Sequence, residues 1–418
     1  MTIHTPHSGA VASNERGRQH LARGELREAA LAFAEAVERD PAFAIAHSNL
    51  AVALWQAGHG DEALHHFRQA TALEPDNPRS HNNLGRALQE HGVAAEALTV
   101  LERAAALSPD DAEIRFNRAL ALLQNGQFTQ GWAEYEWRGR LPRFQSRARP
   151  FAQPRWDGGA LDGRTILIHA EQGLGDTLQF VRFVHLVRER GGRVILEVQP
   201  ALKGLLAGLE GPQVLIARGE PLPPFDCHAP LLSLPHLLGS GGTFPGAEGY
   251  LKTPESTLPR TPGRPVVGLA WAGASLGRLD QVRSLPLDRL WGLVMPRAWD
   301  WVALQVGEPA KVLEKHSLAA RIQIPPLPDF SATAAVIAGL DLVISIDGVV
   351  AHLAGALGRP VWTVLAHGAE WRWGTNGETS PWYASMRLFR QGPERAWGPV
   401  LAHLGAALDR RFERLHGA

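Results

Sequence analysis

The chain has 418 residues, too many for one compact core, so its length predicts two or three domains. Its 42 Lys and Arg residues balance 42 Asp and Glu residues, which excludes a strongly basic nucleic-acid binder. No apolar run reaches the ~20 residues of a transmembrane helix, and the first residues show no signal peptide, so we expect a cytoplasmic protein without a transmembrane segment. The single cysteine, Cys227, excludes an intramolecular disulfide, and we expect it to be a buried thiol in a loop.

The first third of the chain repeats with a period of 34 residues. The recurring positions are Gly24, Gly58, Gly92 and Gly126, then Pro41, Pro75 and Pro109, and then Ala29, Ala63 and Ala97. A glycine suits the left-handed residue that ends one helix, and a proline cannot continue the next helix. This pattern resembles tetratricopeptide repeats and predicts an α-solenoid over residues 10–143, with three full repeats and a fourth, degenerate one.

The resemblance implies a concave groove, lined by the first helix of each repeat, that binds a protein or peptide partner. Asn49, Asn82 and Asn83 lie on predicted first helices and are candidates for this groove. They are equally well explained as solvated polar residues. A linker rich in Arg, Pro and Gly follows at residues 144–163.

From residue 164 onward, short β-branched runs alternate with helical stretches, which predicts parallel sheets covered by helices. The predicted strands are 165–170, 193–198 and 214–217, and, after a Pro-rich break at 253–265, they are 266–271, 301–306, 321–325, 341–346 and 360–365. Two doubly wound lobes of this kind describe a GT-B-like module, with an acceptor-side lobe over 164–260 and a nucleotide-sugar lobe over 261–418. Ligands are expected at the carboxyl ends of the strands, in the cleft between the lobes.

A glycine loop follows the first predicted strand. We expect Gly173 and Gly175 to let the backbone turn sharply, so that the next helix points its N-terminus at the cleft. Asp176 lies in the first turn of that helix. It either caps the helix or acts as a general base that takes a proton from an acceptor hydroxyl.

A second helix start lies in the other lobe. Asp347 ends a predicted strand, and Gly348 and Val349 begin the following helix. The N–H groups and the dipole of such a helix start suit a diphosphate. His352 lies one turn inside the helix, near enough to reach a phosphate, and we expect these four residues to bind the donor.

The loop after the strand that ends at Trp271 supplies the remaining donor candidates. Gly273 opens this loop, and Arg278 and Arg283 follow it. An arginine there can bind phosphate bidentately, although a solvated surface loop would have the same composition.

The aromatic residues Trp371, Trp373 and Trp382 lie in a polar stretch and either stack on a ligand or seal the domain. The sequence has no closely spaced His/Cys set and no D-x-D pair, so we expect no metal site. We expect no cofactor either, since a nucleotide-diphosphate sugar would be the substrate.

Several stretches together resemble bacterial tetratricopeptide-repeat proteins whose C-terminal domain is similar to the ADP-heptose:lipopolysaccharide heptosyltransferases. They are "EQGLGDTLQFVRF", "AHLAGALGRPVW" and "SPWYASMRLFRQ". The resemblance implies a metal-independent GT-B enzyme with a base role for Asp176 and donor-phosphate roles for the turn from Gly348 to His352. This chain departs from the family where Gly348 replaces a usual Thr or Ser, and where Gly273-Ala274-Ser275 replaces a usual Gly-Asn-Pro.

Three functions are therefore compared. The first is a glycosyltransferase that moves a sugar from a nucleotide-diphosphate donor to a protein or glycan hydroxyl, with the repeats recruiting the acceptor or a partner. The second is a non-catalytic repeat scaffold with a degenerate transferase domain, which the two departures favour. The third, a dinucleotide-dependent oxidoreductase, is disfavoured because the third glycine of G-x-G-x-x-G is missing after Gly175.

Overall fold

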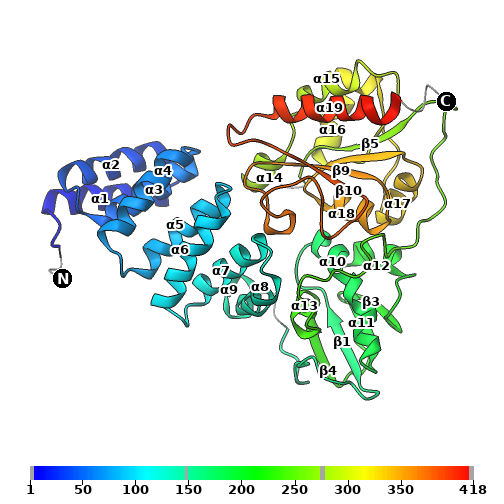
Figure 1. Ribbon diagram of the computed structural model, residues 1–418, viewed down its shortest axis with the longest axis horizontal. Coiled ribbons are helices and arrows are strands. Elements are labelled where there is room, and N and C mark those ends of the chain that lie inside the picture. Colours follow the sequence, from blue (N-terminus) through cyan, green and yellow to red (C-terminus); the bar gives the residue numbers. More distant parts are fainter. Residues whose placement is uncertain (1–3, 146–148, 274–277, 414–418) are drawn as a thin grey trace. The chain divides into compact units, whose positions relative to one another are not determined.

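The computed structural model describes residues 4–145, 149–273 and 278–413 and divides into two compact units (Figure 1). The repeat unit contains Met1–Ser146 and Gly368–Thr375, and the α/β unit contains Arg147–His367 and Asn376–Ala418. In the part of the chain that is described, every helix is too short or too polar to cross a membrane.

Paired antiparallel helices build the repeat unit. They are α1 (Ser8–Ala22), α2 (Leu26–Arg39), α3 (Ala44–Ala57), α4 (Gly60–Leu73), α5 (Pro78–Glu90), α6 (Ala94–Leu107), α7 (Ala112–Gln124) and α8 (Phe128–Tyr135), followed by the short helices η1 (Glu136–Arg140) and α9 (Pro142–Gln145). The four period glycines have φ angles of 76°, 92°, 82° and 75°, so each ends its first helix in the left-handed conformation. The predicted solenoid is confirmed.

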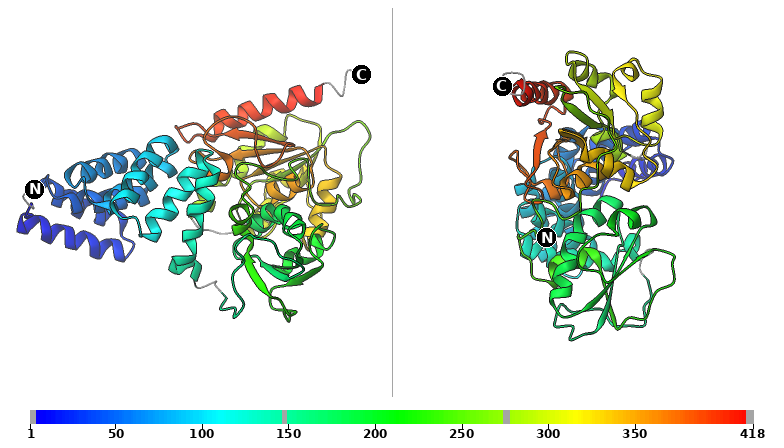
Figure 2. Two further views of the ribbon diagram at one scale, coloured as in Figure 1. Left: turned by 60° about the horizontal axis from the view of Figure 1, so that its bottom comes forward. Right: turned by 90° about the vertical axis from the view of Figure 1, so that its right-hand side faces the viewer.

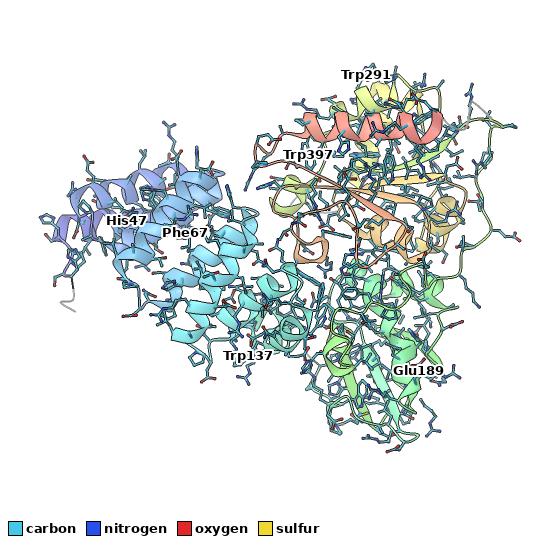
Figure 3. All side chains as sticks on the ribbon, in the orientation of Figure 1. His47, Phe67, Trp137, Glu189, Trp291 and Trp397 are labelled. Atoms are coloured by element: carbon cyan, nitrogen blue, oxygen red, sulfur yellow. The ribbon has the colours of Figure 1, made fainter. Side chains whose placement is uncertain are left out.

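Close approach of helices explains other small residues of the repeats. A Cβ atom on Gly17 would lie 2.5 Å from the Phe33 ring, and one on Gly85 would lie 2.5 Å from the Leu101 side chain. On these two first helices, the glycine leaves room for a bulky side chain of the second helix. Phe67, labelled in Figure 3, is buried in the equivalent position of the middle repeat.

The segment Gly368–Thr375 follows the last strand but one in sequence, yet it packs as part of the repeat unit. Gln124 donates a hydrogen bond of 3.1 Å from Nε2 to the carbonyl of Ala369. The Trp371 ring meets the Trp132 ring edge to face, with centroids 5.4 Å apart. This segment contains η6 (Trp371–Trp373) and lies within the predicted 261–418 lobe. Sequence position alone therefore does not define the two units.

The N-terminal lobe of the α/β unit has a parallel four-stranded sheet in the order β3-β2-β1-β4. Its elements are β1 (Thr165–His169), α10 (Leu174–Phe180), η2 (Val181–Phe183), α11 (Val184–Glu189), β2 (Arg193–Val198), α12 (Pro200–Leu206), β3 (Val214–Ala217), β4 (Cys227–Pro230), η3 (Leu231–Ser233) and α13 (Leu234–Leu237). The expected loop position of Cys227 is wrong, because Cys227 begins β4 and pairs with Ile166. Strand β4 is short and ends at a proline, as is usual at a sheet edge, and this conceals it in the sequence.

The C-terminal lobe has a parallel six-stranded sheet in the order β10-β9-β8-β5-β6-β7. Its strands are β5 (Val266–Ala270), β6 (Asp300–Ala303), β7 (Ile322–Gln323), β8 (Leu342–Ile346), β9 (Val361–Leu365) and β10 (Met386–Arg390). Its helices are α14 (Arg278–Arg283), η4 (Leu287–Leu290), α15 (Trp291–Val294), α16 (Glu308–Glu314), η5 (Ser317–Ala320), α17 (Phe330–Ala338), α18 (Val349–Ala356) and α19 (Trp397–Glu413).

Helix α19 covers one face of this sheet, and Val400, Leu404 and Leu408 join the core formed by the strands (Figure 2). The strand order reverses direction between β5 and β8, so the chain leaves these neighbouring strands toward opposite sides of the sheet. Such a switch point opens a crevice at the carboxyl ends of the strands. The predicted GT-B-like pair of parallel lobes is confirmed, with β4 and β10 as additional strands.

Candidate active site

The starts of helices α10 and α18, one from each lobe, are in direct contact. A Cβ atom on Gly175 would lie 3.1 Å from Cδ2 of His352 and 3.9 Å from Cα of Val349. Since α10 follows β1 and α18 follows β8, the contact lies at the carboxyl ends of both sheets. The structure thus brings the glycine loop and the expected donor helix together.

Asp176 caps its own helix. Its Oδ2 accepts a hydrogen bond of 2.8 Å from the backbone N–H of Gly173, which is one of the donors that a helix start leaves unpaired. Gly173 has a φ of −73°, and Gly175 is inside the helix, so neither residue needs the conformational freedom of glycine for a turn. The close approach of His352 is what requires a small residue at position 175.

At the start of α18 the N-cap residue provides no comparable cap. Gly348 is extended, with φ of −177° and ψ of 178°, and as a glycine it has no side chain that could accept a hydrogen bond. No acidic residue lies in the first turn, and within the described residues a Cβ atom on Gly348 would meet the Ile346 carbonyl alone, at 3.9 Å. Asp347, at the end of β8, is buried. The first N–H groups of α18 and its positive dipole end therefore suit an anion.

His352 is enclosed by neighbours on two sides. It is 4% exposed, and its Nδ1 lies 3.0 Å from Oη of the fully buried Tyr383. The opposite edge of the ring, with Cδ2 and Nε2, faces Gly175. Tyr383 in turn lies under the guanidinium of Arg182. Sequence reasoning missed both residues, although Tyr383 lies in the "SPWYASMRLFRQ" stretch.

The loop after β5 is held by side chains that the sequence did not single out. Gln305 accepts hydrogen bonds at Oε1 from the N–H groups of Trp271 (3.1 Å) and Ala272 (2.9 Å). The N–H of Gly273 donates to Oγ of Ser284 at 3.0 Å. The side chain of Asp280 packs so closely on Gly273 that a Cβ atom there would lie 2.3 Å from its Cγ. This contact requires glycine.

Of the two arginines of this loop, the structure describes the side chain of Arg283 alone. Arg283 forms an ion pair with Asp280, with Nε to Oδ1 at 2.8 Å, so its guanidinium is already engaged. The side chain of Arg278 and residues 274–277 lie outside the described residues. Trp371, Trp373 and Trp382 are all buried, the first two in the repeat unit and the last against Phe244, with ring centroids 3.8 Å apart.

A second polar cluster lies at the strand ends of the N-terminal lobe. Nε2 of His169 lies 3.3 Å from Nδ1 of His228, and the Phe151 ring packs on both imidazoles. Beside them, the buried Glu197 forms an ion pair with Arg149. Burial and, to a smaller extent, the neighbouring His228 and arginines lower the pKa of His169 to about 3, so its imidazole is neutral.

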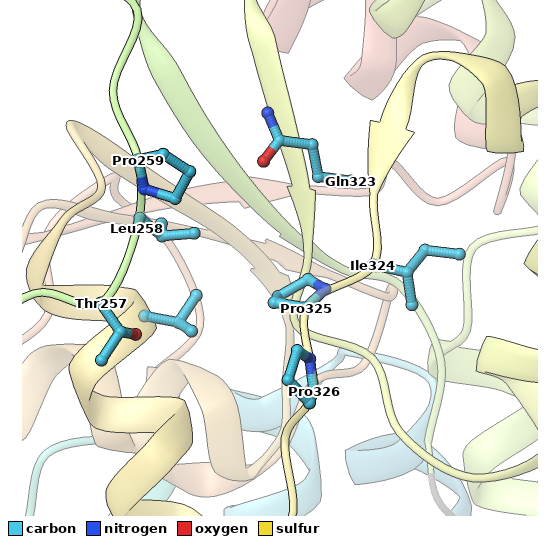
Figure 4. A pocket seen from close by; sticks show the side chains of 8 residues that line it. Thr257, Leu258, Pro259, Gln323, Ile324, Pro325 and Pro326 are labelled. Atoms are coloured by element: carbon cyan, nitrogen blue, oxygen red, sulfur yellow. The ribbon is translucent and has the colours of Figure 1, made fainter.

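A groove of about 330 Å³ lies beside β7 in the C-terminal lobe (Figure 4). It is lined by Thr257, Leu258, Pro259, Gln323, Ile324, Pro325, Pro326 and Val336. None of the donor candidates lines it. Within the described ranges, no three His, Cys, Asp or Glu side chains are arranged to hold a metal ion.

Two of the expected groove residues, Asn49 and Asn82, are each hydrogen-bonded to an asparagine on a neighbouring first helix. Nδ2 of Asn49 donates to Oδ1 of Asn14 at 2.9 Å, and Nδ2 of Asn117 donates to Oδ1 of Asn82 at 2.9 Å. Asn82 is buried, whereas Asn49 and Asn83 are half-buried. These amides link successive first helices, and their contact with a partner stays a prediction.

Comparisons with known proteins agree with this architecture. Residues 14–78, 53–109 and 82–135 match the tetratricopeptide repeat model, and residues 302–395 match the model of glycosyltransferase family 9 (heptosyltransferase). The chain is 28% identical to protein FlbA of Caulobacter vibrioides over 321 residues, or 68% of this chain and 52% of FlbA. It thus spans about half the length of this curated relative.

Solved structures match the repeats. PilF of Pseudomonas aeruginosa is 31% identical and covers 33% of this chain and 63% of its own, with a TM-score of 0.31. The first repeat domain of Spaghetti (RPAP3), bound to an HSP90 peptide, is 22% identical and covers 28% of this chain and 94% of its own, with a TM-score of 0.27. The family models identify tetratricopeptide repeats over residues 14–135 and a domain of the glycosyltransferase family 9 (heptosyltransferase) type over residues 302–395.

Proposed function

We propose that this chain transfers a sugar from a nucleotide-diphosphate donor to a hydroxyl of a protein or glycan that the repeats recruit. The match to glycosyltransferase family 9 supports the reaction class. The contact between the starts of α10 and α18 carries the proposal, because it joins a carboxylate from one lobe to an uncapped helix start from the other.

The donor diphosphate binds at the start of α18. There the N–H groups of Val349 and its neighbour and the helix dipole face the anion, and His352 lies one turn further along. When the bond between the anomeric carbon and the diphosphate oxygen breaks, negative charge builds up on that oxygen. Fixed donors at this position stabilise the leaving group.

Asp176 accepts the proton of the acceptor. As the acceptor oxygen forms its bond to the anomeric carbon, its proton moves to the Asp176 carboxylate. The hydrogen bond from Gly173 N–H orients this carboxylate by holding one of its oxygens. The acceptor then lies on the side of the N-terminal lobe.

The repeats present the acceptor or a partner protein. Val11 on α1 is 45% exposed and Ile45 on α3 is 52% exposed, so the first helices carry apolar side chains on the surface. Asn49 lies on α3 and links it to α1, and Asn82 lies on α5 and links it to α7. An array of this kind suits an extended peptide segment.

The variant Asp176→Asn tests the proposal. An asparagine Oδ1 can still accept the hydrogen bond from Gly173 N–H, so the helix cap and the fold are kept while the basic carboxylate is lost. We expect unchanged donor affinity by calorimetry and no measurable transfer. Asp176→Ala is the comparison that also removes the cap, and it should melt at a lower temperature. Turnover of Asp176→Asn at the wild-type rate would contradict the base role.

A non-catalytic scaffold is the second candidate, and one observation favours it. Gly348 lacks the hydroxyl that the resemblance places at the α18 start, and as a glycine it offers no side chain to cap this helix. Calorimetry with ADP-, UDP- and GDP-sugars, followed by hydrolysis and transfer assays, separates the two functions. Donor binding without hydrolysis or transfer supports the scaffold, and transfer supports the enzyme.

A further inference from the structure

A buried cluster made of Arg182, Tyr250, Tyr383 and His352 lies behind the proposed donor site. It joins η2 of the N-terminal lobe to the segment before β10 and to α18 of the C-terminal lobe. Arg182 is 1% exposed, and among the residues that the structure describes no carboxylate pairs with it. Burying a guanidinium without a counter-ion costs desolvation free energy, which its other partners must offset.

Arg182 is bound by carbonyls and aromatic rings. Its Nη1 donates to the Trp382 carbonyl at 2.6 Å, and its Nε donates to the Gln179 carbonyl at 2.9 Å. Its guanidinium lies 4.6 Å from the ring centroids of both Tyr250 and Tyr383. Arg182 therefore holds both the backbone just before Tyr383 and the ring of Tyr383 itself.

Two side chains can accept the proton of Tyr383, namely Nδ1 of His352 and the hydroxyl oxygen of Tyr250. Arg182 has only N–H donors, so it cannot accept a proton from either phenol. The Tyr250 hydroxyl receives Nη2 of Arg182 at 3.3 Å and donates to the Leu178 carbonyl at 2.6 Å. Burial keeps the pKa of Tyr383 well above its usual value, so its hydroxyl retains a proton. Because the Tyr250 oxygen already accepts from Arg182, we take Nδ1 of His352, 3.0 Å away, as the acceptor of that proton.

Which ring nitrogen of a histidine carries the proton is set by the partner of the other nitrogen. If Nδ1 of neutral His352 accepts from Tyr383, the proton of the imidazole is on Nε2. If His352 is protonated, both nitrogens carry protons. In both states Nε2 is a donor, and this edge of the ring faces Gly175 at the start of α10.

We propose that Tyr383, fixed by Arg182, is a positioning residue that keeps a proton on Nε2 of His352 so that this atom donates to the donor diphosphate. The inference rests on the proposed function, since it takes the diphosphate to bind at the α18 start. It adds that the affinity for the donor depends on the phenol of Tyr383, which lies on neither α10 nor α18.

Gly355 supports this role independently. It lies one turn after His352 on α18, and a Cβ atom there would lie 2.5 Å from Cγ and Cδ1 of Tyr383. The tyrosine ring therefore packs flat on the helix backbone, beside the histidine that it contacts. Gly355→Ala would push the ring away without removing any polar group.

The first test is spectroscopic. In the full chain with ¹⁵N-labelled histidines, the signals of His352 are assigned by their loss in His352→Gln. We expect an unprotonated Nδ1 and a protonated Nε2 in the wild type, and a substantial Nδ1-protonated fraction in Tyr383→Phe and Gly355→Ala. Tyr135→Phe removes another buried phenol and should leave the spectrum unchanged. A wild-type tautomer in both test variants overturns the proposal.

The second test is the affinity for inorganic pyrophosphate and for ADP, UDP and GDP. Losing the ordered donor should weaken binding about three- to tenfold in Tyr383→Phe. In the His352→Gln background the glutamine amide donates without help, so Tyr383→Phe should have no further effect. An equal loss in both backgrounds overturns the positioning role. Unchanged affinity in His352→Ala would instead contradict the proposed donor site, whatever the tautomer.

Discussion

Helices α10 and α18 begin alike and differ in one charge. Each has a glycine as its N-cap residue, Gly173 or Gly348, and neither glycine can accept a hydrogen bond with a side chain. In α10, the Asp176 carboxylate reaches back to the Gly173 N–H and places a negative charge at the helix start. In α18 the first turn has no acid, and His352 follows it.

The comparison shows that one side chain decides what a helix start binds. The dipole and the N–H groups are the same in both, and they favour an anion. At α10 the anion is internal and leaves a carboxylate for proton transfer. At α18 the N–H groups are proposed to bind an external anion. In the proposed reaction, α10 therefore supplies the base and α18 binds the leaving diphosphate.

The largest expected effect comes from making the two starts alike. Gly348 is extended and has room for a side chain, so Gly348→Asp should fold and cap α18. We expect a gain of about 1 kcal/mol in the free energy of unfolding from the cap. Repulsion between the new carboxylate and a diphosphate, about 4 kcal/mol for unit charges 4 Å apart at an effective dielectric constant of 20, should weaken pyrophosphate binding by at least about 100-fold.

Chemical denaturation and calorimetry measure the two effects of Gly348→Asp. Gly348→Asn is the matched control, since it caps the helix without a charge and should raise stability with little loss of affinity. If Gly348→Asp binds pyrophosphate as the wild type does, the anion does not bind at α18.

Lowering the pH should destabilise the N-terminal lobe, which carries α10, through the buried His169. In the N-terminal lobe the pKa of His169 is about 3, below the usual value of about 6.5, so the unfolded chain binds more protons between these values. Stability is therefore full above pH 6.5 and falls as the pH drops through this window. Lowering the pH from 7 to 5 should cost about 2 kcal/mol through this group. His169→Gln should flatten the measured pH dependence by most of that amount, and an unchanged slope would contradict it.

The repeats and most of the strands were predictable because their signals are local. The period of 34 records how each helix pair closes and packs, and the left-handed Gly24 and Gly58 show it directly. Strands buried on both faces, such as β8, form continuous apolar runs. By contrast, β10 is an edge strand in which Arg387 and Arg390 interrupt the apolar run, and it was missed.

The site was predictable only where its residues adjoin a strand end. Asp176 and Gly348 have such positions, and the structure brings their helices together. Arg182 and Tyr383 have none, since their role depends on contacts between segments far apart in the sequence. The sequence allows Asp176 to cap α10, but it does not specify the backbone N–H, that of Gly173, from which the carboxylate accepts.

A smaller effect should follow from restoring a neutral hydroxyl at α18. Gly348→Thr fits the extended backbone and adds a donor beside the first N–H groups. One added hydrogen bond to a charged group is worth about 1.5 kcal/mol or more before ordering costs, so pyrophosphate affinity should rise up to about tenfold. Gly348→Val has a similar shape without the hydroxyl and should show no gain. Weaker binding by the threonine variant than by the valine variant would contradict the expected position of the diphosphate.

The smallest expected effect concerns the contact between the two helix starts. A Cβ atom on Gly175 would lie 3.1 Å from Cδ2 of His352, close enough to displace the ring by a few tenths of an ångström. Gly175→Ala should stabilise α10 slightly, because alanine favours helix, and should weaken pyrophosphate binding about two- to threefold through His352. In His352→Ala the clash is absent, so the same substitution should leave affinity unchanged. A similar loss in both backgrounds would mean that position 175 acts on the anion directly and that the contact between the starts has no part in binding it.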